Sequence, residues 1–392
     1  MDTGFQAAFM LDHMRVLCKE LPPRLPASLG EHRAAEYVAD ALRRLGLTEV
    51  TLQPYRGISS LGLPATIAAL IGVLGFLVGW WAGTVGLWLG GALLFLSAYT
   101  IRNLLRTVPP FFQALIARRT GYNVVANLPA RQPARRQIFI LAHLDANKQR
   151  FTFPPSVPAL MKPMETGSVL LLLMAGLSFW LQALLPWSLF GFQAAALAVL
   201  LVVLLGLWAD EFQPTVEGAN DNASAIGVAL ALADRLRKEP LTHSEVTLLF
   251  TGCEEVGHHG LQAYLKQNRP PKDNTYWIDL ELVGAGRLCF ATKHGVSYLT
   301  EYKPGEEILQ LAQEVAQSNP SLHVTGRPML ILEEVSTLRN HGYNAICLMG
   351  YNEQGYLPNW HRLSDTMENI EPATLECAAS FTWELLQAID KK

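Results

Sequence analysis

The sequence predicts an α/β domain with a mixed, mostly parallel sheet flanked by helices, together with four transmembrane helices in two hairpins. Two observations support this fold class. Two long blocks of the 392-residue chain contain no Asp, Glu, Lys, Arg or His, and the remaining residues alternate between short apolar runs and helical patterns. Alternating strands and helices favour a parallel sheet covered by helices, whereas long uncharged blocks are typical of membrane spans.

The two uncharged blocks cover residues 57–101 and 166–209, with lengths of 45 and 44 residues. Because a membrane-spanning helix needs about 20 apolar residues, each block has the length of a helical hairpin. We expect one crossing at Leu61–Trp81 and another at Val169–Leu185, each followed by a return helix. Tryptophans near the expected turns fit the membrane interface. Buried core helices of a soluble fold are the alternative, but both blocks are longer than such a core requires.

Three polar segments surround the hairpins, at residues 1–56, 102–165 and 210–392, and we expect them to form one domain. Each hairpin returns the chain to the side that it left, so the three segments share one compartment. All Lys and Arg residues lie in these segments, and several lie close to the expected membrane ends. The positive-inside rule therefore predicts a multi-pass membrane protein whose polar domain is cytoplasmic.

Composition narrows the compartment and the classes of partner. A net charge of −3 gives no reason to expect nucleic acid, which normally binds to a concentrated basic face. The five scattered cysteines show neither a disulfide framework nor CxxC spacing, in agreement with a reducing compartment. The first residues lack a basic start followed by an apolar core, so we expect no cleavable signal peptide. The expected surroundings are therefore a lipid bilayer and the cytoplasm.

Helices and strands alternate along the polar segments. Apolar runs rich in β-branched residues and bounded by turn residues predict strands at 48–55, 121–129, 136–146, 244–252, 275–284 and 344–351. Helical periodicity predicts helices at 30–47, 222–239, 306–318 and 373–392. Since ligands of such folds gather at the carboxyl ends of the strands, the residues that follow the strands are candidates for a functional site.

The stretch "FTGCEEVGHHG" places Glu254 and Glu255 side by side directly after an apolar strand. Like charges held close together raise one another's pKa and cost free energy unless a cation or a proton compensates. The pair is therefore either a solvated loop, which is common, or half of a metal site. We expect His258 and His259, which follow the glycine turn, to be solvent-exposed and at most to line the rim of a pocket.

Other acidic and histidine side chains also stand at strand ends. His143 and Asp145 point to the same face of an extended segment, so Asp145 could hold the imidazole and fix its tautomer. Asp221 lies in a glycine-led turn before a helix, where the positive end of the helix dipole can steady a carboxylate. The remaining candidates are Asp279, Glu281, His361 and Asp365. Two histidines with several carboxylates are the ligand set of a zinc or two-metal hydrolytic site.

Five short motifs in this order, "HLD", "GANDNAS", "CEEVG", "LELVG" and "HRLSDT", resemble those of the M28 family of zinc-dependent aminopeptidases and carboxypeptidases. The resemblance covers essentially all of the chain outside the two hairpins. It implies a mixed eight-stranded sheet flanked by helices and a pair of zinc ions. The three polar segments would then be the catalytic domain.

The resemblance also implies a role for each matching residue. The ligands of the two zinc ions would be His143 for one, Asp221 as the bridging carboxylate, and Glu255 and His361 for the other. Glu254 matches the general base, and Asp145 matches the residue that orients His143. Two cations about 3.5–4 Å apart activate a bridging water and polarise the scissile carbonyl. The general base takes the proton of that water and passes it to the leaving amine.

Two positions depart from the family pattern. Counting back from Gly284, the remaining ligand position falls on Glu281, where the family usually has Asp, and Asp279 on the same strand face is the alternative ligand. Trp360 precedes His361 where many family peptidases have Tyr, and its indole offers only an N–H. A Trp-His pair resembles the related glutaminyl cyclases instead.

The resemblance and the hairpins together predict a membrane-anchored zinc exopeptidase that acts on peptides, with an aminopeptidase as the first expectation. A glutaminyl-cyclase-like acyltransferase and a catalytically inactive membrane scaffold are the alternatives. The second hairpin lies between His143 and Asp221 in the sequence. About 20 residues separate Asp145 from the hairpin, and about 11 separate the hairpin from Asp221. Such short connections require a site near the membrane surface, which suggests membrane-associated or hydrophobic peptides as substrates.

Overall fold

A mixed sheet forms the core of the polar segments in the computed structural model, which describes residues 4–150 and 158–392. Residues 1–3 and 151–157 of the predicted domain lie outside the described residues. The nine strands found in the described residues are β1 (Val50–Gly57), β2 (Arg119–Leu128), β3 (Arg136–His143), β4 (Ser244–Thr251), β5 (Thr275–Glu281), β6 (Arg287–Ser297), β7 (Thr300–Tyr302), β8 (Thr325–Met329) and β9 (Asn344–Tyr351). Their order is β1-β2-β4-β3-β5-β9-β6-β7, and β8 pairs with β6.

The centre of the sheet is parallel and its margins are mostly antiparallel. Strands β4, β3, β5 and β9 run parallel to one another, whereas β1, β2 and β7 pair antiparallel to their neighbours. The predicted mixed sheet in an α/β fold is therefore confirmed. The described sheet has one strand more than the eight that the family resemblance implies, because β8 adds in parallel to β6.

Helices cover both faces of the sheet and so explain the apolar sequence of its central strands. In β3, Ile138 and Ile140 pack into one apolar core, whereas Phe139 and Leu141 pack into a second one, as expected when successive side chains point to opposite faces. Helices α1 (Ala7–Arg15), α2 (Leu29–Arg44), α8 (Ser224–Lys238), α10 (Glu306–Ser318) and α12 (Pro372–Lys391) contribute to the first core. Helices α9 (His259–Asn268) and α11 (Glu334–Asn340) contribute to the second.

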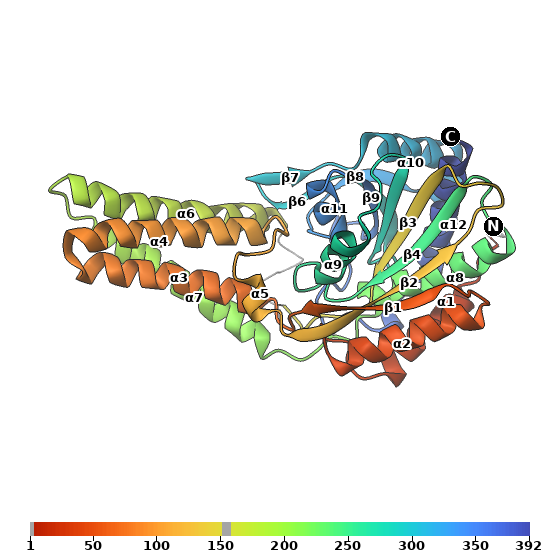
Figure 1. Cartoon of the computed structure of the whole chain (residues 1–392), viewed down its shortest axis with the longest axis horizontal. Helices are drawn as coiled ribbons and strands as arrows, with labels where there is room; N and C mark the ends of the chain where they lie inside the picture. Colours follow the sequence, from red (N-terminus) through yellow and green to blue (C-terminus); the bar gives the residue numbers. More distant parts are fainter. Residues whose placement is uncertain (1–3, 151–157) are drawn as a thin grey trace.

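The two uncharged blocks form four long helices that project from one end of the α/β domain as a bundle (Figure 1). These helices are α3 (Gly62–Trp81), α4 (Gly83–Leu104), α6 (Pro158–Leu184) and α7 (Phe190–Glu211). A short helix, α5 (Gln113–Ile116), follows the first pair. By length and composition, all four long helices could cross a membrane.

Glycines allow the bundle helices to approach one another closely. A Cβ atom added at Gly90 of α4 would lie 2.5 Å from the carbonyl oxygen of Gly75 in α3. One added at Gly91 would lie 2.8 Å from the carbonyl oxygen of Gly176 in α6. Small residues at such contacts are typical of membrane helices, whose association depends on close packing.

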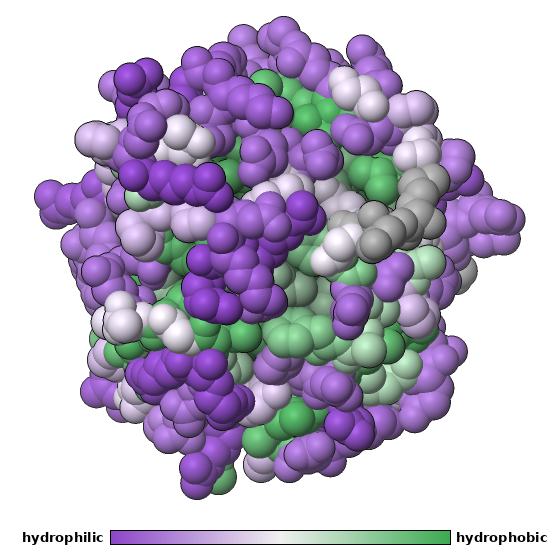
Figure 2. Space-filling view, turned by 90° about the vertical axis from the view of Figure 1, so that its right-hand side faces the viewer, coloured by the Kyte–Doolittle hydropathy of each residue, from purple (hydrophilic) through white to green (hydrophobic). Residues whose placement is uncertain are grey.

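The two ends of the molecule differ in surface character. Large apolar side chains are exposed along the bundle, including Leu74, Val85, Leu170, Val202 and Leu205. Figure 2 shows the opposite end of the molecule, which is mostly hydrophilic with separate smaller apolar areas. An apolar medium around the bundle and water around the domain would suit this distribution.

Candidate metal centre

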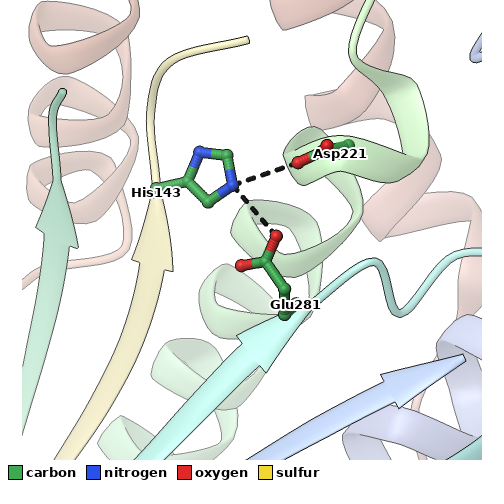
Figure 3. A group of neighbouring side chains, drawn as sticks. All are labelled: His143, Asp221 and Glu281. Atoms are coloured by element: carbon green, nitrogen blue, oxygen red, sulfur yellow. Dashed lines mark hydrogen bonds and ion pairs between the residues drawn. The ribbon is translucent and has the colours of Figure 1, made fainter. Parts of the chain in front are cut away.

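Three buried side chains meet where two central strands and a turn converge. His143 ends β3, Glu281 ends β5, and Asp221 lies in the segment Ala219–Ala223 that precedes α8 (Figure 3). The Nε2 atom of His143 lies 3.1 Å from Asp221 Oδ1 and 3.2 Å from Glu281 Oε1. These three residues, called the strand-end group below, can each offer one ligand atom to a metal ion.

A second group of possible ligands shares Asp221 with the first. The Nε2 atom of His361 lies 3.3 Å from Asp221 Oδ2 and 3.0 Å from Glu255 Oε2. Asp221, Glu255 and His361 are called the loop group below, because they lie between or after regular elements. Asp221 turns one carboxylate oxygen to each group, which is the arrangement that a bridging ligand requires.

The chemistry of both groups fits divalent cations such as zinc. Imidazole nitrogens and carboxylate oxygens are common zinc ligands, and three carboxylates buried with two imidazoles need positive charge for compensation. Within the described part of the chain, Glu255 Oε1 and His361 Nδ1 are buried without a hydrogen-bond partner. A buried carboxylate oxygen without a donor is costly, so a cation beside Glu255 would relieve that cost.

The pKa values of the metal-free groups indicate that they need a compensating charge. Burial alone would lower the pKa of His361, but the carboxylates of Glu255 and Asp221 outweigh it and raise this pKa to about 10. Burial opposes ionisation of Asp221, yet its bonds to His143 and His361 lower its pKa. Burial raises the pKa of Glu281 well above its ordinary value. Zinc would therefore replace protons that the metal-free groups hold.

Glu254 lies beside both groups and belongs to neither of them. Its Oε2 atom is 4.0 Å from His143 Nε2, and its Oε1 atom is 3.1 Å from His258 Nε2. Burial raises the pKa of Glu254, and the neighbouring charge of Glu255 adds to the shift. Its position close to the possible ligands but outside their groups makes Glu254 a candidate for proton transfer.

Asp145 holds the backbone of the glutamate pair in place. Its two carboxylate oxygens accept hydrogen bonds from the backbone N–H groups of Glu254 and Glu255, each at 3.1 Å. His143 Nδ1 donates to the backbone oxygen of Asp145 at 3.1 Å and lies 3.5 Å from its carboxylate. Asp145 therefore orients His143 largely through its main chain, while its side chain fixes the turn that carries both glutamates.

The prediction that His258 and His259 are solvent-exposed is wrong. Their exposed fractions are only 3% and 5%. His258 Nδ1 lies 2.9 Å from the hydroxyl of Thr337 in α11, whereas Gln113 in α5 donates to His259. Helices that lie far away in the sequence cover this turn, and local sequence carries no signal of such burial.

Two further residues support the candidate centre, and the sequence pointed to only one of them. Asp365 accepts the backbone N–H groups of Asn220 and Asp221 at 2.6 and 3.2 Å, and so fixes the turn of the shared carboxylate. Asn147 Nδ2 donates to Glu255 Oε2 at 2.6 Å. Asp365 was a candidate by its place in "HRLSDT", but Asn147 was not.

The two departures from the family pattern occupy different surroundings. Glu281, and not Asp279, lies in the strand-end group of the described residues. Burial and the charges of Glu334 and Glu333 raise the pKa of Asp279. Trp360 packs in the second apolar core, and its ring lies 4.7 Å from the His361 ring, centroid to centroid.

Comparison with known proteins agrees with this centre. Residues 201–386 match the model of the family described as "Peptidase family M28", a range that contains four of the five possible ligands. No curated protein matches the sequence significantly. The match shows that this part of the chain is similar to peptidase family M28.

Solved structures with the same fold include both peptidases and cyclases. A Zn-dependent exopeptidase from Parabacteroides distasonis has a TM-score of 0.56 at 14% identity, with 98% of both chains covered. A leucine aminopeptidase precursor from Bacteroides thetaiotaomicron has a TM-score of 0.58 at 14% identity, covering 98% of this chain and 97% of that one. A glutaminyl cyclase from the same species has a TM-score of 0.57 at 13% identity, with 98% of both covered. The fold is therefore that of the zinc exopeptidases, and it does not separate the two activities.

Proposed function

We propose that the protein is a membrane-anchored, zinc-dependent exopeptidase, and in the first place an aminopeptidase. The observation that carries this proposal is the position of Asp221, which turns one oxygen to the strand-end group and the other to the loop group. The expected ligands are His143 and Glu281 on one side and Glu255 and His361 on the other, with two zinc ions held between them. The family match and the fold support this set.

Residues of the chain would divide the catalytic work as follows. Bound zinc supplies Lewis-acid chemistry, which makes water more acidic and polarises the scissile carbonyl. Glu254 accepts the proton of the attacking water and donates it to the amine that leaves. The side chain of Asp145 holds Glu254 in place through the backbone N–H bond. His258 contacts the far oxygen of Glu254 and restricts the direction in which the carboxylate can turn.

We further propose that the bundle crosses the membrane as two hairpins, at residues 57–101 and 166–209. Segments 1–56, 102–165 and 210–392 would then form the catalytic domain on the cytoplasmic side. The distribution of Lys and Arg supports this side. Because the second hairpin lies between His143 and Asp221, the centre is close to the bundle, which favours membrane-associated or hydrophobic peptides.

A glutaminyl-cyclase-like activity is the second candidate. Trp360 stands directly before His361, as in the Trp-His pair of the cyclases, and the indole packs against the imidazole. Cyclisation needs an activated carbonyl of the Gln side-chain amide, which the substrate's own amine attacks in place of water while ammonia leaves. The two activities therefore differ in the attacking group and in their products.

A single experiment on detergent-purified full-length protein separates these possibilities. Zinc content is measured by mass spectrometry, and amino-terminal, carboxyl-terminal and N-terminal-Gln peptides are then assayed in parallel. An aminopeptidase releases the first residue and is inhibited by a zinc chelator. Ring closure of the Gln peptide without residue release would favour the cyclase instead. A protein without bound zinc or turnover would be an inactive scaffold.

A further inference from the structure

A single carboxylate joins the ends of two bundle helices to the α/β domain. Glu211, the last residue of α7, accepts the backbone N–H of Gly62, the first residue of α3, at 3.1 Å. The same oxygen accepts a hydrogen bond from Arg150 Nη1 at 3.1 Å. The ammonium group of Lys148 donates to the backbone oxygen of Glu211 and lies 3.5 Å from its carboxylate. Two bundle helices and the chain after β3 therefore meet at Glu211.

Arg150 extends this contact towards the candidate metal centre. Its Nε atom donates to Asn147 Oδ1 at 3.1 Å, and its backbone N–H donates to the carbonyl oxygen of His361 at 3.0 Å. Only 3% of Arg150 is exposed. A guanidinium that is buried so completely requires a partner charge, and Glu211 provides one.

Asn147 completes the path to the loop group. Its Oδ1 atom accepts hydrogen bonds from Arg150 and from the backbone N–H of Lys148, so its Nδ2 atom must face the other way. That atom donates to Glu255 Oε2 at 2.6 Å and lies 3.3 Å from His361 Nε2. The orientation of a possible metal ligand thus depends on an arginine whose partner belongs to the helix bundle.

The strand-end group is supported in a different way. His143 and Glu281 end neighbouring parallel strands, and Glu281 Oε2 accepts a hydrogen bond from Asn222 at 3.0 Å. These contacts lie within the α/β domain. Loss of the Glu211 contact should therefore affect the loop group selectively.

We propose that Glu211 and Arg150 are positioning residues for the loop group, so that the junction of α3 and α7 sets the geometry of one half of the metal centre. This inference rests on the proposed zinc function. Glu211 and Arg150 act through Asn147 on Glu255, and through the main chain on His361. Residues that orient metal ligands in this way commonly change metal affinity about 10–100-fold when they are replaced.

The test compares E211Q with a matched control in full-length, detergent-purified protein. Glu301 of β7 pairs with Lys162 of α6 at 3.4 Å and with Lys293 at 3.2 Å, and neither partner belongs to the path through Arg150 and Asn147. E301Q therefore removes an ion pair between bundle and domain without touching the path through Arg150. Zinc release to a chromogenic chelator is titrated for wild type, E211Q and E301Q, and peptide turnover is measured beside it.

We expect E211Q to lose one zinc ion at least about tenfold more readily than wild type, with the other ion unchanged. Its kcat should fall while KM changes little, and E301Q should behave like wild type. R150K is the second variant, because lysine keeps the positive charge but cannot bond Asn147 and Glu211 together through a planar fork. It should reproduce the loss seen in E211Q, and it decides the question if E211Q does not fold.

The inference is overturned if E211Q or R150K releases both zinc ions no more readily than wild type. It is also overturned if a variant binds both ions more weakly to the same degree, or if E301Q shows the same loss of zinc. Absence of zinc from the wild-type protein overturns it as well. If wild type binds two zinc ions but hydrolyses no peptide, the proposed function fails. The zinc titration then still decides the role of Glu211 and Arg150.

Discussion

The two halves of the candidate metal centre share Asp221 but are supported by different parts of the molecule. In the strand-end group, His143 and Glu281 end β3 and β5, which pair in parallel inside the sheet. In the loop group, Glu255 and His361 follow no strand directly, and their neighbours lead through Arg150 to the helix bundle. One half is therefore fixed by the sheet and the other by contacts between distant segments.

On this inference, a helix bundle takes part in a site that contains none of its residues. The hydrogen bonds of the sheet hold the strand ends whether or not the bundle is correctly packed. The loop group has no such ladder, and its geometry follows that of the junction at Glu211. A change in the packing of α3 against α7 would be felt first at Glu255 and His361.

The largest effect is expected from Glu254, which belongs to neither half. Glu254→Gln keeps the size of the side chain but removes its ability to accept a proton. Because general acid–base catalysis contributes about 10²–10⁴-fold, kcat should fall by that factor. Zinc content, measured by mass spectrometry, should remain that of the wild type. Turnover close to wild type would remove Glu254 from the role of general base.

The next effect separates the two carboxylates of β5. Glu281→Gln should reduce the zinc content from two ions to about one per chain, because a neutral amide is a poor zinc ligand. Asp279→Asn is the matched control on the same strand face, and it should retain both ions. Zinc stoichiometry of the two purified variants decides the question. Loss of zinc from D279N with retention in E281Q would reverse the assignment of the ligand.

The central strands and the long helices could be predicted from sequence because their composition alone is informative. Strands β3, β4 and β5 are buried on both faces and appear as apolar runs, and the helices of the bundle lack charges almost throughout. Strand β6 could not be predicted from sequence, because polar residues interrupt its apolar run. Its pairing with β8 also shifts at an irregularity near Lys293. Helix α6 begins well before the predicted Val169. The uncharged block does not reveal its first turns, because these carry charged residues that lie outside the block.

The possible ligands were visible in motifs, whereas the residues that orient them were not. His143, Asp221 and Glu255 stand in short patterns at element ends, where chemistry and position coincide. Arg150 and Glu211 have no such pattern, because a single ion pair between segments 61 residues apart shows only when the chain is folded. The burial of His258 likewise depends on α11, which no local property of the turn reveals.

The smallest predicted effect concerns His258, which connects Glu254 to α11 and, through α11, to the segment after bundle helix α4. His258 lies 3.1 Å from Glu254 and 2.9 Å from Thr337, whose hydroxyl donates to Thr107 in the segment after α4. Burial lowers the pKa of His258 to about 4, so its ring is neutral near pH 7. A neutral ring carries a single N–H. Since the Thr337 hydroxyl donates to Thr107, His258 Nδ1 donates to Thr337, and Nε2 is the acceptor for Glu254 in its protonated form, which burial favours.

Replacement of His258 by Ala should lower kcat by about tenfold and leave both zinc ions in place. A hydrogen bond between neutral groups contributes roughly 0.5–1.5 kcal/mol, and its loss is expected to appear as misorientation of Glu254. His258→Gln can still bond both Glu254 and Thr337 and should restore most of the activity. Steady-state kinetics with zinc analysis of the two variants checks this. Equal loss in both variants, or loss of zinc from either, would show that His258 supports the fold of the turn and does not orient Glu254.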